Sequence, residues 1–439
     1  MWRAVNLQPV FSPPEPVGAE EFEKSMAAFV PPASPRIALA VSGGPDSMAM
    51  AWLAKGWAEK KNFALKAFIV DHGLRMASAA EAKETLNRLS RLGIDAEILR
   101  WDHTPIVSKI HATARKARYR LLAEACKKSG ISDLLLAHNR EDQAETILMR
   151  FAKGSGVGGL AGIRSEGSFD DIRILRPLLD FSKERLRATC RSARVSFITD
   201  PSNSAEKYAR GRLRIIMPLL ADEGFTIDRL IDLGSRASEA SAALDHYTSL
   251  LLRVGGRLDD FGVVKFDLEQ LRSSPRAVAA RAVAHSLQVV HAEEYPPEQA
   301  SLDRLLDLLL ADDEMQPRTL QGCLIHKTSD HAVFMREFSA IAETGTLSPG
   351  ETVIWDGRWE ISLSPQALPG RYSVSPLGNP PHDLLDNLAP GLRHRLPQGR
   401  ARASLPSLRD SSNLLIIPAF GTEAAAATAH ARLLSRWPG

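Results

Sequence analysis

The six residues Ser42–Ser47 form a turn whose small, hydroxyl and acidic side chains suit a phosphate chain; we call them the phosphate turn. Glycines let the backbone approach an anion closely, and serines can donate hydroxyl hydrogen bonds. Asp46 would repel bare phosphate, so we expect it either to cap a helix or to hold Mg²⁺ that bridges to phosphate. The expected nucleotide-binding residues are Ser42, Gly43, Gly44, Pro45, Asp46 and Ser47.

A second chemically competent segment, His138–Glu145, follows the apolar run at 133–137; we call it the acidic turn. Asp142 and Glu145 are three residues apart and therefore share one helical face, away from the predicted apolar stripe. Paired carboxylates beside a phosphate site can hold Mg²⁺ or an ammonium group. They can also simply complement the positive end of a helix dipole.

Short apolar runs alternate with helical stretches around both turns. The predicted strands are 37–41, 65–70, 96–101 and 133–137, and the predicted helices are 47–58, 79–92, 109–128 and one beginning at 143. This alternation predicts βαβ units in a parallel sheet, in which ligands bind beyond the carboxyl ends of the strands. The two turns should therefore meet at one edge of the sheet, with His138 at a strand end.

The composition and the hydrophobic pattern of the sequence change along its 439 residues. Residues 1–35 are proline-rich, and we predict that they form an N-terminal arm with one short helix. Residues 36–222 hold the α/β pattern, residues 223–314 are mostly helical with a strand-like break at 263–266, and residues 315–439 show short strands between turns. We predict a catalytic α/β domain, a helical domain and a small β-rich C-terminal domain.

Composition narrows the function classes. Cys126, Cys190 and Cys323 are far apart and form no CxxC pair, so we expect neither a disulfide framework nor a cysteine-based metal site. No apolar run approaches the length that spans a bilayer, and the expected location is cytoplasmic. The formal net charge is only +3, so any nucleic-acid surface must come from local clusters. Oligomeric state stays open, a homodimer included.

These segments resemble the PP-loop ATP-pyrophosphatases and, among them, the tRNA(Ile)-lysidine synthetases. The phosphate turn resembles their SGGxDS signature, and the acidic turn resembles their AHHxDDQxET segment. Further matching segments follow in the same order: Asp71–Leu74, Ala114–Tyr119, Gly154–Gly162, Arg176–Leu179, Asp200–Asn203, Arg210 and Arg214. The resemblance covers residues 36–220 and implies a Rossmann-like, adenine nucleotide alpha hydrolase-like fold.

The chain departs from the family pattern at three positions. Asn139 stands where the family has a second histidine, and Glu141 stands where it has a first aspartate. Gly211 replaces the asparagine of an Arg-Asn pair. The roles of Asn139 and Gly211 are therefore open.

The resemblance implies that ATP adenylates the C2 oxygen of the wobble cytidine (C34) in the CAU-anticodon tRNA(Ile). The ε-amine of L-lysine then attacks C2, and AMP leaves. The roles implied for single residues are as follows: Asp46 and Asp142 hold Mg²⁺, Asp142 and Glu145 handle lysine's ammonium or the metal, Arg115 neutralises phosphate or the lysine carboxylate, and His138 assists at the reacting centre.

Basic clusters supply candidate tRNA contacts at 109–120, 173–194, 210–214 and 393–409. Such clusters bind phosphate backbones without reading sequence, although solvated helix faces have the same composition. One rival interpretation is another PP-loop tRNA enzyme, such as a 2-thiocytidine synthetase, which the missing cysteine pairs disfavour. A small-molecule amide-forming PP-loop synthetase and a non-catalytic RNA-binding scaffold are the others.

Overall fold

The computed structural model describes residues 14–32, 34–74, 77–103, 110–198, 209–292, 296–342, 344–388, 392–420, 428–435 and 437–438. The chain forms two compact units, Met1–Ser241 and Ala242–Gly439. The long helix α9 (Ile227–Gly255) begins in the first unit and ends in the second. The matching segment Asp200–Asn203 lies outside the described residues.

The first unit is built on a six-stranded sheet with the order β3-β2-β1-β4-β6-β5, in which only the edge strand β5 runs antiparallel to its neighbour. Its strands are β1 (Arg36–Ala40), β2 (Ala64–Asp71), β3 (Asp95–Arg100), β4 (Asp133–Leu136), β5 (Glu166–Phe169) and β6 (Ile172–Leu175). Its helices before α9 are α1 (Ala19–Ala27), α2 (Pro45–Lys61), α3 (Ser78–Arg91), α4 (Ile110–Lys128), α5 (Arg140–Ala152), α6 (Val157–Leu160), α7 (Lys183–Ser192) and α8 (Ala209–Asp222). The predicted α/β fold with a parallel, Rossmann-like core is confirmed.

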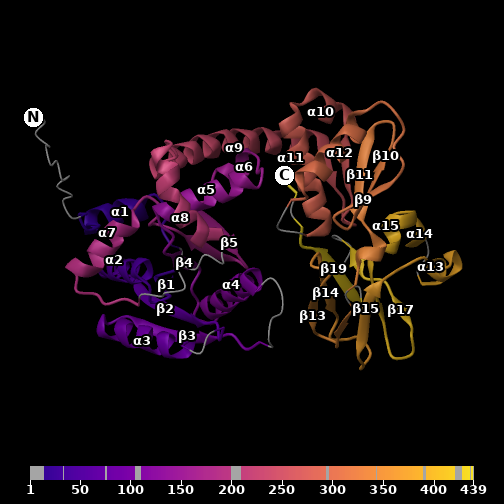
Figure 1. Cartoon of the computed structure of the whole chain (residues 1–439). Helices are drawn as coiled ribbons and strands as arrows, with labels where there is room; N and C mark the ends of the chain where they lie inside the picture. The colour runs from indigo at the N-terminus through magenta and orange to yellow at the C-terminus, as the bar shows by residue number, and fades with distance from the viewer. Residues whose placement is uncertain are drawn as a thin grey trace, which may run out of the picture. The chain divides into compact units, whose positions relative to one another are not determined.

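Helices cover both faces of this sheet. Strand β1 alternates its side chains between two cores, because successive residues of a strand point to opposite faces. Ile37 and Leu39 pack with residues of α1, α2, α3 and α7, whereas Ala38 packs with residues of α4. Figure 1 shows α1, α2 and α7 grouped on one side, with α4 away from them.

The chain reverses its path across the sheet between β1 and β4. From β1 it winds outward through β2 to β3, and it then returns to place β4 on the other side of β1. The two strands are parallel and in register, with Ala40 opposite Leu136. Ligands bind at such switch points, and the two turns that leave these strand ends are the phosphate turn and the acidic turn.

The predicted N-terminal arm contributes to the first unit's core. Phe22 and Met26 of α1 are buried in the cluster that contains α2 and α7. The Val17 backbone N–H donates to the Thr189 hydroxyl at 2.8 Å, and Arg185 pairs with Glu21 at 2.7 Å. The described part of the arm is therefore packed on the sheet's helices.

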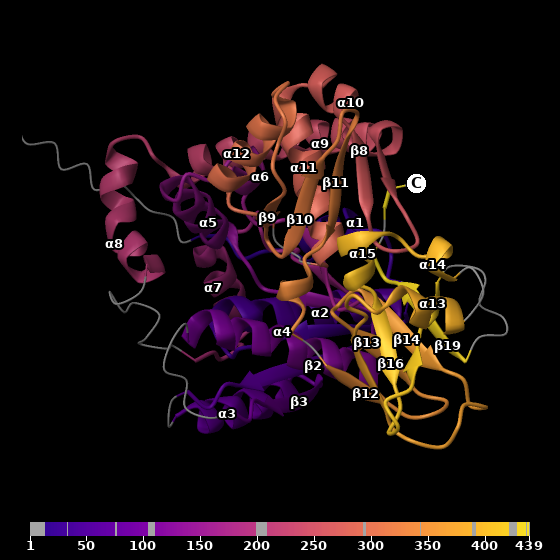
Figure 2. The same ribbon diagram turned by 90° about the vertical axis from the view of Figure 1, so that its right-hand side faces the viewer.

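The second unit combines helices with three antiparallel-rich sheets. Figure 2 shows β9, β10 and β11 beside α11 and α12. One sheet has the order β7-β8-β11-β10-β9, and the two others have the orders β12-β15-β16-β17 and β13-β14-β19-β18. The predicted β-rich C-terminal part is confirmed, while the division into four segments at 35, 222 and 314 stays a prediction.

The elements of the second unit after α9 have these bounds: β7 (Gly256–Leu258), β8 (Val264–Asp267), α10 (Leu268–Ser273), α11 (Arg276–His291), α12 (Gln299–Leu310), β9 (Arg318–Leu320), β10 (Cys323–Lys327), β11 (His331–Arg336), η2 (Phe338–Ala340), β12 (Gly345–Leu347), β13 (Thr352–Trp355), β14 (Trp359–Leu363), β15 (Tyr372–Pro376), α13 (His382–Leu388), α14 (Leu392–Arg395), α15 (Gly399–Ala403), β16 (Pro406–Arg409), β17 (Leu415–Ile416), β18 (Ala419–Phe420) and β19 (Ala429–Leu433). Within the described residues, no helix is long and apolar enough to cross a bilayer.

Candidate active site

The phosphate turn is held in shape by its first glycine. Gly43 has φ +83°, a left-handed conformation that costs little only for glycine. A Cβ on Gly43 would lie 2.3 Å from the Thr85 hydroxyl oxygen, so the turn packs directly on α3. The Gly43 carbonyl accepts a 2.8 Å hydrogen bond from the Ile198 backbone N–H. Gly43 is therefore required by the protein's own packing.

Gly44 is not constrained by close packing as Gly43 is, and the two serines hydrogen-bond within the turn. Gly44 is the N-cap of α2, and a Cβ there would meet only the Ser42 hydroxyl at an ordinary 3.7 Å. The Ser47 hydroxyl accepts from the Ser42 backbone N–H at 3.2 Å and donates to the Gly44 carbonyl at 3.0 Å. Space beside Gly44 is therefore left open, which suits the close approach of a phosphate to the end of α2.

Asp46 is the second residue of α2, behind Pro45, and Gly44 occupies the cap. The alternative that Asp46 caps the helix is therefore wrong. One carboxylate oxygen, Oδ1, is buried without a hydrogen-bond partner among the described residues. Burial raises the pKa of Asp46 to about 6; the charges of Asp142 and Glu141 add to this rise, and Lys183 and Arg187 oppose it. An orphaned, partly desolvated carboxylate fits a cation ligand.

The acidic turn closes on itself at the start of α5. Asn139 is the N-cap, and its side chain accepts a 2.9 Å hydrogen bond from the Asp142 backbone N–H. The Asp142 carboxylate accepts in return from the Asn139 backbone N–H at 3.2 Å. This reciprocal capping box gives Asn139, a departure from the family pattern, a structural role.

Glu145 is nearly fully buried, with 3% of its surface exposed, and is paired with Arg214 of α8. The Arg214 guanidinium donates to both carboxylate oxygens, at 2.5 and 3.3 Å, and lies 3.9 Å from Asp142. Burial alone would lower the pKa of Arg214, but Glu145, Asp142 and Asp46 raise it above its usual value. Asp46, Asp142 and Glu145 thus share one charged region at the switch point.

His138 and Arg115 occupy different places relative to this region. His138 follows β4 and is half-buried, and its backbone N–H donates to the Leu136 carbonyl at 3.0 Å. Arg115 is exposed on α4, donates to the Tyr119 hydroxyl at 3.1 Å and lies over that ring at 5.0 Å. Burial lowers the pKa of Arg150 in α5, and the charges of Arg164 and Arg115 lower it further. None of the described contacts brings Arg115 to Asp46, so its role stays a prediction.

Two residues of this charged region, Arg214 and Glu141, have no role predicted from the sequence. Arg214 belongs to a motif that matches the family, but its pairing with Glu145 spans 69 positions and has no local signal. Glu141 accepts a 2.8 Å hydrogen bond from the Lys183 backbone N–H and thereby joins α5 to α7. The Ser182-Lys183 sequence at the start of α7 marks a helix N-terminus, and that signal could have pointed to Lys183.

The donors near Asp46 can be compared with the needs of Mg²⁺. No group of three or more His, Cys, Asp or Glu side chains with metal-site geometry occurs in the part of the chain that the structure describes. Mg²⁺ in phosphate-transferring sites usually takes only one or two carboxylates and completes its shell with phosphate and water. The orphaned Asp46 oxygen fits this pattern, with Asp142 as the neighbouring carboxylate.

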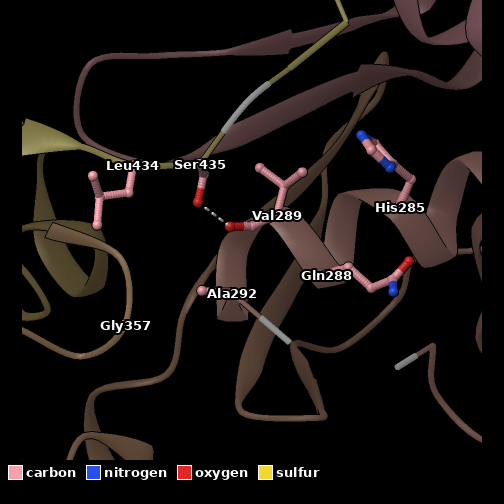
Figure 3. A pocket seen from close by; sticks show the side chains of 7 residues that line it. All are labelled: His285, Gln288, Val289, Ala292, Gly357, Leu434 and Ser435. Atoms are coloured by element: carbon pink, nitrogen blue, oxygen red, sulfur yellow. Dashed lines mark hydrogen bonds between the residues drawn. The ribbon is translucent and has the colours of Figure 1, made fainter. Parts of the chain in front are cut away.

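Cavities elsewhere do not gather the predicted site residues. In the first unit, a largely apolar cavity of about 330 Å³ lies between α5, α9 and the segment 223–225 that follows α8, and it is lined in part by Ile147, Phe151 and Leu230. In the second unit, a shallow cavity of about 300 Å³ lies beside α11, where the Ser435 hydroxyl donates to the Val289 carbonyl (Figure 3).

The chain is similar in sequence to known proteins. The sequence profile of the PP-loop domain matches residues 19–220. The tRNA(Ile)-lysidine synthase of Rhodopseudomonas palustris is 39% identical over 340 residues, which cover 73% of this chain and 95% of that protein. The tRNA(Ile)-lysidine synthase of Wolbachia pipientis wMel is 34% identical over 331 residues, which cover 75% and 77%.

Among solved structures, a U34-tRNA thiolase from Methanococcus maripaludis aligns with a TM-score of 0.44 and 17% identity, covering 50% of this chain and 78% of that one. These two relatives each align with about three quarters of this chain, and both are tRNA(Ile)-lysidine synthases. The chain belongs to the tRNA(Ile)-lysidine synthase family.

Proposed function

We propose that this chain uses ATP to attach lysine to C2 of the wobble cytidine in the CAU-anticodon tRNA(Ile). The observation that carries the proposal is the meeting of the phosphate turn and the acidic turn at the switch between β1 and β4. Family membership supports the choice of tRNA(Ile) as substrate. We expect the reaction to take place in the cytoplasm.

In the first step, the cytidine C2 oxygen attacks the α-phosphorus of ATP, and pyrophosphate leaves. The N–H groups at the start of α2, with Ser42 and Ser47, would hold the polyphosphate. Asp46 and Asp142 would hold Mg²⁺, which when bound neutralises phosphate charge. The open space at Gly44 and the orphaned Asp46 oxygen support these roles.

In the second step, the ε-amine of lysine attacks C2, and AMP leaves with the former C2 oxygen. Asp142 and Glu145 would face the ammonium group, and Arg214 fixes the Glu145 carboxylate in place. His138, at the end of β4, would act at the reacting centre. Arg115 would neutralise phosphate or the lysine carboxylate from α4. Preorganised charges of this kind stabilise a transition state because they need no rearrangement during reaction.

The direct test incubates the protein with ATP, labelled lysine and bulk tRNA, followed by nucleoside analysis. We expect lysine-labelled cytidine in an isoleucine tRNA, with AMP and pyrophosphate formed in equal amounts. Label that enters no tRNA, or ATP–pyrophosphate exchange that needs a small molecule instead of tRNA, would contradict the proposal. The second outcome would favour a small-molecule amide-forming PP-loop synthetase.

A further inference from the structure

Helix α7 is a third element beside the phosphate turn, in addition to α2 and α5, and it begins with a lysine. The helix packs along α2 (Figure 1). The Cys190 thiol of α7 donates to the Pro45 carbonyl at 3.4 Å. The first residue of α7 is Lys183, whose backbone N–H is held by the Glu141 carboxylate at 2.8 Å. The backbone of Lys183 is therefore fixed where α2, α5 and α7 meet, independently of its ammonium group.

The other cations of α7 near its start have partners. Arg185 pairs with Glu21 at 2.7 Å and also donates to the arm's carbonyls, and Arg187 pairs with Glu184 at 2.8 Å. Lys183 is a half-buried residue, and its ammonium forms no ion pair with a carboxylate of the described residues. Its charge nevertheless acts on Asp46 more strongly than that of Arg187. The geometric evidence is the position of α7, which packs along α2 and begins at the Glu141 carboxylate beside the acidic turn.

The charge balance around Asp46 shows why a cation is needed there. Asp46, Glu141 and Asp142 are three carboxylates in one region, and Glu145 is already compensated by Arg214. A triphosphate entering this region meets like charge, and the leaving pyrophosphate gains charge as it departs. Lysine is a compact point charge that suits phosphate oxygens, and a charge-assisted hydrogen bond is stronger than a neutral one.

We propose that Lys183 binds the β and γ phosphates of ATP at the phosphate turn and then holds the departing pyrophosphate. The inference rests on the proposed ATP-dependent function and adds a specific residue from α7 to it. No covalent bond to Lys183 forms. Phosphate binding thus draws on α7 as well as on the turn before α2.

The test compares Lys183→Gln with Lys183→Arg and with Arg191→Gln, which removes an exposed cation farther along the same helix. Calorimetry measures the Kd of a non-hydrolysable α,β-methylene ATP analogue with Mg²⁺, and kinetics measure product inhibition by pyrophosphate. We expect Lys183→Gln to weaken both by about tenfold, the size of one charge-assisted contact. Lys183→Arg should stay within about threefold of the parent, and Arg191→Gln should match it. The KM for lysine should not change in any variant.

A Lys183→Gln protein that binds the analogue and pyrophosphate as the parent does would overturn the inference, as would a loss confined to the KM for lysine. Lys183→Met gives the same comparison if the glutamine variant does not fold. Lysidine formation by the unsubstituted protein is measured first. Its absence would count against the proposed function, whereas normal lysidine formation with unchanged binding in Lys183→Gln would count against Lys183 alone.

Discussion

The phosphate turn and the acidic turn leave neighbouring parallel strands at the same sheet edge. They differ in whether the protein itself supplies partners for their polar groups. The acidic turn is satisfied by the protein: Asn139 and Asp142 cap each other, and Arg214 neutralises Glu145. The phosphate turn keeps an open approach at Gly44 and an unpartnered oxygen on Asp46. Unmet polar groups beside an open turn indicate where a ligand belongs, while the satisfied turn supplies a fixed frame.

The largest expected effect follows from removing the unpartnered carboxylate. Asp46→Ala should lower kcat for lysidine formation by about a thousandfold or more, since it removes the proposed Mg²⁺ ligand beside the phosphates. Nucleoside analysis of tRNA after single-turnover reactions measures the loss. Normal lysidine formation in this variant would break the assignment of the phosphate turn as the reactive site.

The two glycines should separate packing from binding. Gly43→Ala should reduce the free energy of unfolding by about 2–4 kcal/mol, because it forces a left-handed alanine against Thr85. Gly44→Ala should change that free energy by less than about 0.5 kcal/mol. It should nevertheless weaken ATP binding by about tenfold or more, as its methyl group would occupy the phosphate approach.

Denaturant unfolding and calorimetric ATP titration of both glycine variants test this contrast. Equal stability of the two variants would show that the turn is not held by Gly43. Unchanged ATP affinity in Gly44→Ala would remove the open approach from the description of the site.

The ionisation of Asp46 should be visible in stability against pH. Its pKa is raised from 3.8 to about 6, so the folded chain holds a proton that the unfolded chain releases in this interval. Stability should therefore fall as pH rises from about 4 to about 6 and stay lower above it. Asp46→Asn avoids this cost and should be more stable by roughly 1–3 kcal/mol at pH 7.5, with the difference vanishing near pH 4. Thermal melts of ligand-free protein across this range measure it, and a constant difference at all pH values would exclude the ionisation as its source.

Substitution in the acidic turn should mainly reduce the free energy of unfolding. Glu145→Gln leaves Arg214 without its anionic partner and should reduce the free energy of unfolding by about 1–3 kcal/mol, less than for a fully buried pair because Arg214 is partly exposed. A matched control is Glu360→Gln, which breaks the exposed pair with Arg432 and should cost less than about 1 kcal/mol. Equal effects in urea unfolding would mean that the Glu145 pair contributes no more than a surface contact.

Local patterns in the sequence predicted the strands of the sheet well, but they did not predict the side-chain pairs between distant parts of the chain. The four strands predicted from the sequence, β1 to β4, lie within one residue or so of their predicted bounds, because the strands of a parallel sheet are short apolar runs between turn residues. The pairing of Glu145 with Arg214 joins positions 69 apart, and periodicity carries no information about such contacts. The basic segment 173–194 also reads as a nucleic-acid surface, yet Arg173 pairs with the buried Asp133 and Arg185 holds the arm. Several charges of that cluster are therefore structural.

The smallest expected effect concerns Asn139, where the sequence alone left the role open. Asn139→Ala removes the side-chain acceptor of the α5 cap and should reduce the free energy of unfolding by about 1 kcal/mol. Asn139→Asp keeps an acceptor oxygen at the same position and should restore most of it. Because the cap holds Asp142 without contacting the phosphate turn, Asn139→Ala should leave ATP affinity within about twofold of the parent. Urea unfolding and ATP titration of the same preparations measure both quantities. A tenfold loss of ATP affinity with unchanged stability would mean that Asn139 acts on the nucleotide, and the division between a satisfied and an unsatisfied turn would then have to be redrawn.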